Sequence, residues 1–356
     1  MQRLAERNWL FGPERNKPGT NKQDANNMKK ALVTGGGGFL GSNIVRMLLD
    51  KGVSVRSLQR SDNPDLKKLG VDIIRGDISN QTTVINAAQD CDIVFHVAAK
   101  AGVWGDYDDY YQCNVVGTEN VLKACRTHNI QKLIYTSSPS VIFDGHDETN
   151  INESAPYPEH FLTAYQKTKA LAEQIVLDAN CDSLLTVALR PHLIWGPGDP
   201  HLVPRIIERA KTGQLRLVGK QNNLVDSTYV DNAALAHILA AEDLMNDAVC
   251  AGKAYFISNG EPLPMAELIN KILATSGLAP VTKIIPTQLA YTIGLLMELF
   301  YKTLNLNTEP VITRFIAKQL SSAHYYDLSA AKQDFFYEPT VSIDEGMERL
   351  KLSFKE

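Results

Sequence analysis

The stretch ALVTGGGGFLG, residues 31–41, decides how the chain folds. It follows a short apolar run and opens an amphipathic helical pattern, so its glycines lie at a strand-to-helix junction. Small residues there let the backbone turn tightly and bring amide N–H groups against a pyrophosphate. Gly36, Gly38 and Gly41 satisfy GxGxxG, while Gly35, Gly38 and Gly41 satisfy GxxGxxG, so two registers remain open. The loop predicts a dinucleotide site in the first βα unit.

Outward from this loop, short apolar runs alternate with helical patterns. The runs are nearly continuously apolar, which is typical of parallel strands buried on both faces. Strands are expected at 30–34, 53–58, 71–76, 92–99, 132–138 and 184–190, and helices near 40–50, 80–89, 108–128 and 161–179. This alternation predicts an α/β fold with a Rossmann-type doubly wound parallel sheet.

Three regions are expected along the chain. Residues 1–27 are rich in Asn and charge and predict a disordered extension. Residues 28–190 predict the dinucleotide-binding Rossmann domain. After residue 190 Pro and Gly cluster and the alternation loosens, so residues 191–356 predict a smaller substrate-binding region that is partly interleaved with the sheet.

Composition excludes several classes of function. The chain of 356 residues carries 36 basic and 40 acidic side chains, and no part of the sequence is a basic stripe. The composition therefore argues against nucleic-acid binding. Five widely spaced cysteines without a CxxC favour a reducing cytoplasm, and the eight histidines show no metal-ligand spacing. The apolar stretch 289–304 is interrupted by Glu298 and is shorter than the roughly 20 residues of a membrane-spanning helix.

The end of the second expected strand bears on the choice of dinucleotide. An acidic side chain there holds the ribose 2′-OH of NAD, whereas an arginine accommodates the 2′-phosphate of NADP. Gln59, Arg60 and Ser61 stand at this position, with no acid before Asp62. NADP(H) is therefore favoured, and NAD(H) remains an alternative in which Arg60 is a solvated loop charge.

The segment TAYQKTKALAE, residues 163–173, contains a candidate acid/base pair. Tyr165 and Lys169 are four residues apart, so on a helix they share a face. A nearby ammonium favours phenolate and lowers the pKa of a phenol, which is otherwise about 10. Ser138, at the carboxyl end of the fifth expected strand, can fix a carbonyl oxygen beside them. A YxxxK pattern alone is common by chance. Because Tyr165 and Lys169 follow a glycine loop and Ser138 at a strand end, the three residues together indicate catalysis.

Together these segments resemble the extended short-chain dehydrogenase/reductase family, through TGGGGFLG, NVVGTENVL, YTSS, YQKTK and LRPHLIWGPGD. The resemblance covers nearly everything from Met28 onward. It implies Tyr165 as general acid/base, Lys169 as its partner, Ser138 as the carbonyl-orienting hydroxyl and Asn114 as a structural bridge. The implied cofactor-binding residues are Gly35, Gly38, Phe39, Leu40, Gly41, Arg60, Asp77, Ile78, Ala98, Ala99, Tyr165, Lys169, Pro191 and Ile194.

Within the family the sequence is most similar to the 3β-hydroxysteroid dehydrogenase-like branch. There it resembles the bacterial enzymes of long-chain olefin biosynthesis, which reduce the ketone of a 2-alkyl-3-oxoalkanoate with NADPH. Trp104, Trp195 and the 289–304 stretch are expected to surround a hydrophobic small-molecule substrate, although an apolar stretch at helical spacing is more often core or a subunit contact. Lys100 and His192 are candidates to meet the substrate carboxylate, and the alternative for each is a solvated charge or a satisfied polar group.

Other functions remain open at this point. A 3β-hydroxysteroid or sterol-carboxylate dehydrogenase would use the same site in the oxidative direction. A nucleotide-sugar epimerase or dehydratase would share the scaffold, and a non-catalytic NAD(P)-sensing protein would need only the dinucleotide site. The resemblance further implies a homodimer through the 108–128 and 161–179 helices, and association with pathway enzymes is a further possibility.

Overall fold

The computed structural model describes residues 28–304, 306 and 308–355, so the expected extension at 1–27 lies outside the described residues. A seven-stranded parallel sheet with the strand order β12-β7-β5-β4-β1-β2-β3 forms its centre. The strands are β1 (Lys30–Thr34), β2 (Ser54–Gln59), β3 (Asp72–Arg75), β4 (Ile93–His96), β5 (Lys132–Thr136), β7 (Leu185–Pro191) and β12 (Lys253–Ile257). The predicted doubly wound parallel sheet is confirmed.

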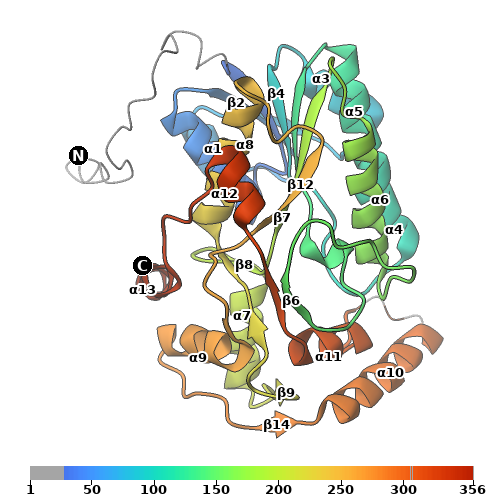
Figure 1. Ribbon diagram of the computed structural model, residues 1–356, viewed down its shortest axis with the longest axis vertical. Helices are drawn as coiled ribbons and strands as arrows, with labels where there is room; N and C mark the ends of the chain where they lie inside the picture. Colours follow the sequence, from blue (N-terminus) through green and yellow to red (C-terminus); the bar gives the residue numbers. More distant parts are fainter. Residues whose placement is uncertain (1–27, 305, 307, 356) are drawn as a thin grey trace.

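Helices cover both faces of this sheet (Figure 1). On one face lie α3 (Gln81–Ala88), α5 (Gly117–Thr127) and α6 (Ala164–Asp178), and on the other α1 (Phe39–Asp50) packs against α8 (Val230–Met245). The short α2 (Pro64–Lys68) joins β2 to β3. All six strands expected up to residue 190 form within one or two residues of their predicted starts. Most are largely buried, whereas β3, at the edge of the sheet, has no fully buried residue.

The helix expected at 108–128 is interrupted. It consists of α4 (Tyr107–Tyr111), a π-helical turn η1 (Gln112–Val116) and α5. The turn places Asn114 in the interior, where its side chain bonds the backbone of residue 100 and the hydroxyl of Thr168. Asn114 thus bridges the loop after β4 to helix α6, as the family resemblance implied.

The segment after residue 190 contributes to the sheet and also builds a second, smaller body. Its strand β12 pairs with β7 in the main sheet, and α8 packs on α1. Its remaining strands are short: β8 (Ile194–Trp195), β9 (Leu217–Val218), β10 (Leu224–Val225), β11 (Thr228–Tyr229), β13 (Leu263–Pro264), β14 (Ile284–Ile285) and β15 (His324–Tyr326). The earlier strand β6 (Glu148–Ile151) joins them by pairing with β15.

The helices of this part surround those short strands. They are α7 (Leu202–Lys211), α9 (Met265–Thr275), α10 (Thr287–Thr303), α11 (Arg314–Ser321), α12 (Ser329–Phe335) and α13 (Ile343–Ser353), and a 3₁₀ turn η2 (Pro139–Val141) follows β5. Helices α7, α9, α10 and α11 lie beyond the carboxyl end of the main sheet (Figure 1). In the part of the chain that the structure describes, no helix is both long and apolar enough to cross a membrane.

Candidate active site

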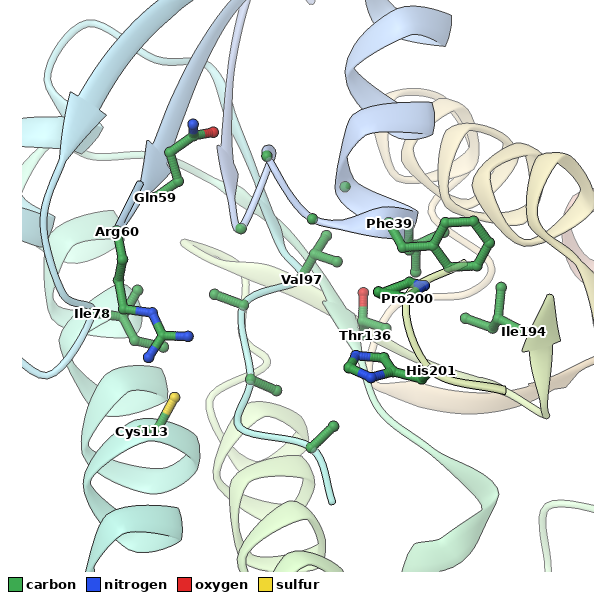
Figure 2. A pocket seen from close by; sticks show the side chains of 18 of the residues that line it. Phe39, Gln59, Arg60, Ile78, Val97, Cys113, Thr136, Ile194, Pro200 and His201 are labelled. Atoms are coloured by element: carbon green, nitrogen blue, oxygen red, sulfur yellow. The ribbon is translucent and has the colours of Figure 1, made fainter. Parts of the chain in front are cut away.

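A cavity of about 630 Å³ runs along the carboxyl ends of β1, β2, β4, β5 and β7, where open α/β sheets bind ligands. All fourteen residues named above as cofactor-binding line it, and so does Ser138. Figure 2 shows the cavity with Gln59 and Arg60 at one end and Thr136, Ile194 and His201 at the other. An elongated ligand therefore fits it better than a compact one.

The middle of the cavity is a glycine cradle that leaves no room for side chains. A Cβ atom on Gly41 would lie 2.1 Å from the carbonyl oxygen of Gly35, and one on Gly35 would lie 2.9 Å from Cα of Ala98. Gly35 also has φ of +71°, which side chains disfavour. Gly36 faces Ser57 instead of the cavity. The structure thus selects the GxxGxxG register of Gly35, Gly38 and Gly41, and the cradle suits a dinucleotide pyrophosphate.

The end of β2 carries a neutral side chain where an NAD site has an acid. Gln59 accepts a hydrogen bond of 2.7 Å from the hydroxyl of Ser57 and donates one of 2.8 Å to the carbonyl oxygen of Ser61. The guanidinium of Arg60 is exposed and extends along the cavity wall towards Ile78 and Cys113 (Figure 2). This end of the cavity therefore presents a cation and a carboxamide.

Helix α6 positions the acid/base pair, and a capping box fixes where the helix begins. The Thr163 side chain accepts from the Gln166 amide, and the Gln166 side chain accepts from the Thr163 amide. The Gln166 carboxamide also donates to the carbonyl oxygens of Ser140 and Phe143, at 3.0 and 2.8 Å. These bonds join the first turn of α6 to the loop that carries Ser138.

The phenol of Tyr165 lies beside the hydroxyls of Ser138 and Ser140, near enough for both to act on its pKa. The Ser140 hydroxyl in turn donates to Oγ of Ser138 over 2.9 Å. Burial raises the pKa of Tyr165, and the two serine hydroxyls only partly oppose this shift. From the sequence, the ammonium of Lys169 was expected to lower the pKa of Tyr165. In the structure the net shift of this pKa is upward. Tyr165 is therefore protonated at neutral pH and poised as a proton donor.

Lys169 lies one turn further along α6, with 2% of its surface exposed. Its ammonium donates a hydrogen bond of 2.6 Å to the carbonyl oxygen of Thr136 and lies 4.2 Å from the ring centre of Tyr135. Burial lowers the pKa of Lys169 to about 7, although the carboxylate of Glu173 acts in the opposite direction. The lysine can therefore change charge near neutral pH.

Two turns after Tyr165, the same helix face carries Glu173, which sequence reasoning missed. Its carboxylate is fully buried and receives hydrogen bonds of 2.9 and 2.6 Å from the guanidinium of Arg190 and one of 2.6 Å from the Tyr157 hydroxyl. Burial alone would raise the pKa of Glu173, but the bonds from Arg190 outweigh it and the pKa is lowered. Its place four residues after Lys169 was the signal available in the sequence.

The structure places none of the four expected substrate residues in the cavity wall. Trp195 is fully buried, with its ring against Tyr229 and its N–H bonded to Ser227, so the prediction for Trp195 is wrong. His192 is 6% exposed and hydrogen-bonded to His324, so it too is a core residue.

The other two expected substrate residues lie outside the cavity wall. The Lys100 ammonium is paired with Asp109 over 2.7 Å. The indole N–H of Trp104 donates to the carbonyl oxygen of Leu306, over 3.2 Å. Both residues therefore contribute to the surface beside the cavity.

His201 is a further residue that the sequence did not single out. It lines the cavity, and Figure 2 shows its imidazole projecting inward from the loop that carries Pro200. The carboxylate of Asp199 fixes that loop, because it accepts hydrogen bonds of 2.8 Å from the amides of both His201 and Val203. His201 has no local sequence signal, since the loop reaches the cavity only through the fold.

Comparison with known proteins agrees with this geometry. The 3-beta hydroxysteroid dehydrogenase/isomerase family matches residues 32–286. A 2-alkyl-3-oxoalkanoate reductase of Shewanella oneidensis is 55% identical over 91% of this chain and 86% of its own length. Another from Stenotrophomonas maltophilia is 54% identical over 91% and 99%. The mouse sterol-4-alpha-carboxylate 3-dehydrogenase (decarboxylating) is 38% identical over 93% of this chain and 92% of its length.

Solved structures show the same fold at lower identity. The crystal structure of gox2253 superposes with a TM-score of 0.75 at 25% identity and covers 92% of this chain and 98% of its own. MoeE5 in complex with UDP-glucuronic acid and NAD has a TM-score of 0.71 at 23% identity, with coverages of 92% and 99%. This second likeness concerns the fold alone.

Proposed function

The chain belongs to the 3-beta hydroxysteroid dehydrogenase/isomerase family of NAD(P)-dependent oxidoreductases, and we propose that it reduces the ketone of a long-chain 2-alkyl-3-oxoalkanoate with NADPH. The product would be the 2-alkyl-3-hydroxyalkanoate of olefin biosynthesis. One observation carries the reductase assignment: Tyr165, Ser138 and Lys169 meet at one end of a cavity whose middle is a glycine cradle.

Side chains of the protein orient the ketone and supply the proton that its oxygen receives. A bound NADPH would supply the hydride. Ser138 donates a hydrogen bond to the ketone oxygen and keeps it beside the phenol of Tyr165. Tyr165 donates its proton as negative charge develops on that oxygen. The raised pKa of Tyr165 keeps the phenol protonated until that moment, and Ser140 helps to hold Ser138 in position.

Lys169 acts through position and charge. Its bond to the Thr136 carbonyl holds the ammonium at the end of β5, within the cavity wall. An ammonium there can donate to ribose hydroxyl groups and favours negative charge on the oxygens nearby. Glu173 lies one further turn along α6, so its buried carboxylate favours the charged form of Lys169. Arg190 in turn keeps that carboxylate ionised.

Arg60 and Gln59 support the choice of NADPH. A guanidinium binds a phosphate with strong, charge-assisted hydrogen bonds. The carboxamide of Gln59 is held by Ser57 and Ser61, so no carboxylate at the end of β2 repels a 2′-phosphate. Asp62 also lines the cavity, but its carboxylate is paired with Lys67 over 2.8 Å.

The substrate assignment is supported by the relatives and by the cavity wall near Tyr165. Pro191, Leu193 and Ile194 provide apolar surface there, which suits alkyl arms and fixes chain length only loosely. His201 provides a group that can bind a carboxylate, the role for which Lys100 and His192 were expected. The two reductases that are 54 to 55% identical to this chain act, by their names, on this class of acid.

A sterol-4-carboxylate dehydrogenase is the second candidate, because relatives of 37 to 38% identity carry that name. A nucleotide-sugar enzyme is disfavoured because the cavity wall near Tyr165 is apolar. A non-catalytic NAD(P) sensor is disfavoured because it needs no serine hydroxyl beside a buried Tyr165. A homodimer through the 108–128 and 161–179 helices, pathway partners and a cytoplasmic location remain part of the proposal, and five unpaired cysteines support a reducing compartment.

A panel of alcohols tests this assignment. The purified chain is offered a long-chain 2-alkyl-3-hydroxyalkanoate, a 3β-hydroxysteroid, a 4-carboxysterol and a UDP-sugar, each with NADP⁺ and with NAD⁺. The proposal expects the highest kcat/KM for the hydroxyalkanoate with NADP⁺. Preferred oxidation of a sterol with NAD⁺ would retain the catalytic residues and overturn both the substrate and the cofactor.

A further inference from the structure

The turn between β7 and β8 contains a backbone conformation that leucine rarely adopts. Leu193 has φ of +41°, in the left-handed region that favours glycine. Among the other described residues, those besides glycine that share a positive φ are Asp90, Asn129, Asn150, Ala248 and Phe336. Within this described set, Leu193 alone lines the cavity. A strained backbone that persists in a functional site points to a role for its residue in function.

Hydrogen bonds on both sides of Leu193 impose this conformation. The amide of His192 donates to the carbonyl oxygen of Ile257 over 3.1 Å, and the hydroxyl of Thr228 donates to the carbonyl oxygen of His192 over 2.7 Å. The amide of Thr228 donates to the carbonyl oxygen of Leu193 over 3.2 Å. The chain therefore passes from its pairing with β12 to its pairing with β11 within two residues, and Leu193 makes the turn between them.

The turn directs the side chain of Leu193 into the cavity. Successive side chains of an extended strand point to opposite faces, yet Leu193 and Ile194 both line the cavity. The left-handed backbone at Leu193 accounts for this exception. Leu193 is half-buried and also packs against the core cluster that contains Trp195 and Val203. Its side chain is thus fixed between the core and the space where a substrate would lie.

The two candidate classes of acid carry the same reacting group. In a 2-alkyl-3-hydroxyalkanoate, the carbon that bears the carboxylate is bonded to the carbon that bears the hydroxyl. A 3β-hydroxy-4-carboxysterol has the same arrangement in its first ring, but fused rings replace the alkyl arms. Side chains that contact only the reacting oxygen, such as Tyr165 and Ser138, therefore cannot distinguish the two acids. Selection between them has to come from the part of the cavity wall that contacts the arms.

We propose that Leu193 selects flexible alkyl arms over fused rings at the substrate end of the cavity. A side chain that projects from the wall narrows the space beside it. An alkyl arm bends around such a projection by rotating its single bonds, whereas a rigid ring system cannot. Glycine would suit the backbone of this turn better and would leave the wall open, so the strained leucine serves the choice of substrate. The inference rests on the proposed function and explains how its substrate class is chosen.

The test compares the oxidation by NADP⁺ of a long-chain 2-alkyl-3-hydroxyalkanoate and of a 3β-hydroxy-4-carboxysterol, and its readout is the ratio of the two kcat/KM values. Wild type should favour the alkyl acid. Leu193→Gly should shift the ratio towards the sterol acid by at least about tenfold, the scale on which methylene groups in an apolar pocket discriminate. Leu193→Ala should shift the ratio in the same direction, and it carries the test if the glycine variant fails to fold.

The matched control is Ala248→Gly. Ala248 also has a positive φ, of +52°, but lies outside the cavity wall, so this substitution relieves the same kind of backbone conformation and should leave the ratio unchanged. NADPH binding, measured by fluorescence, verifies that each variant is folded.

Two results would overturn the role of Leu193 alone, in a chain that prefers the alkyl acid. The ratio could be the same in wild type and in the folded Leu193 variants, or Ala248→Gly could shift it as much as they do. A wild type that prefers the sterol acid would instead overturn the proposed function, and this inference with it.

Discussion

The ammonium of Lys169 donates its 2.6 Å hydrogen bond to the carbonyl oxygen of Thr136, while the phenol of Tyr165, one helical turn earlier, lies beside the hydroxyls of Ser138 and Ser140. The two side chains therefore share a site but hold different partners. Tyr165 is kept protonated by burial, and Lys169 is held where its charge depends on pH. This division of roles leads to separate predictions for each group.

The activity of the reductase should fall as pH rises through about 7. Burial lowers the pKa of Lys169 to about 7, so its ammonium loses its charge above that value. Tyr165 has a raised pKa and stays protonated across the same range. The kcat/KM for the oxoalkanoate, measured from pH 5.5 to 9.5, should show this alkaline limb in wild type.

The limb should disappear in Lys169→Gln, which is expected to have lower activity at every pH. Residual activity of Lys169→Gln that still declined near pH 7 would assign the limb to another group. Ser140→Ala serves as the control, because it leaves Lys169 unchanged and should retain the limb.

The buried pair of Glu173 and Arg190 should be essential for stability. Both side chains are less than 5% exposed, and removing one partner leaves a buried charge uncompensated. Arg190→Met is expected to lower the free energy of unfolding by about 3–5 kcal/mol. Urea unfolding followed by fluorescence measures the change.

The half-buried Arg349 supplies the matched control for that measurement. It pairs with Glu345 and Asp231 near the surface, and Arg349→Met should cost at most about 1 kcal/mol. Equal effects of the two substitutions would show that the buried pair contributes no more than a surface one.

Arg60 should select the phosphorylated cofactor. Arg60→Ala should lower kcat/KM for NADPH by about 10- to 100-fold, which corresponds to the loss of a hydrogen bond to a charged group. The value for NADH should change by less than about twofold, because no phosphate contact is lost. Arg126→Ala, in the last turn of α5, is the control. A parallel loss with both cofactors would assign Arg60 a structural role.

His201 should recognise the carboxylate of the substrate. His201→Gln is expected to raise KM for the 2-alkyl-3-oxoalkanoate by about tenfold, as for the loss of one charge-assisted hydrogen bond. KM for the matched dialkyl ketone, which has no carboxylate, should be unchanged. Equal increases for the acid and the ketone would show that His201 shapes the cavity without binding the charge.

The fold was predictable from sequence because the βα alternation and the glycine junction are local patterns. The error at Trp195 has a physical cause. Ile194 and Trp195 are neighbours in β8, and successive side chains of a strand point to opposite faces, so Ile194 lines the cavity and Trp195 enters the core. Which residue faced the cavity depended on the pairing of β8 with β11, more than thirty residues away in the sequence.

Other parts of the site depended on contacts that span the chain. The His192 ring is enclosed because β15 brings His324 to it, and the sequence gives no sign of that pairing. His201 enters the cavity through a loop fixed by Asp199. By contrast, Tyr165, Lys169 and Ser138 could be named from sequence, since helical spacing and a strand end determine where they lie.

The most direct test of the account follows NADPH consumption with a freshly prepared long-chain 2-alkyl-3-oxoalkanoate, using wild type and Tyr165→Phe in parallel. Tyr111→Phe serves as control, and cofactor binding is measured separately by fluorescence. Wild type should turn over, and Tyr165→Phe should lose about 10²- to 10⁴-fold in kcat while still binding NADPH. A Tyr165→Phe variant that keeps most of the turnover would contradict the assignment of Tyr165 as the proton donor, and with it the proposed mechanism.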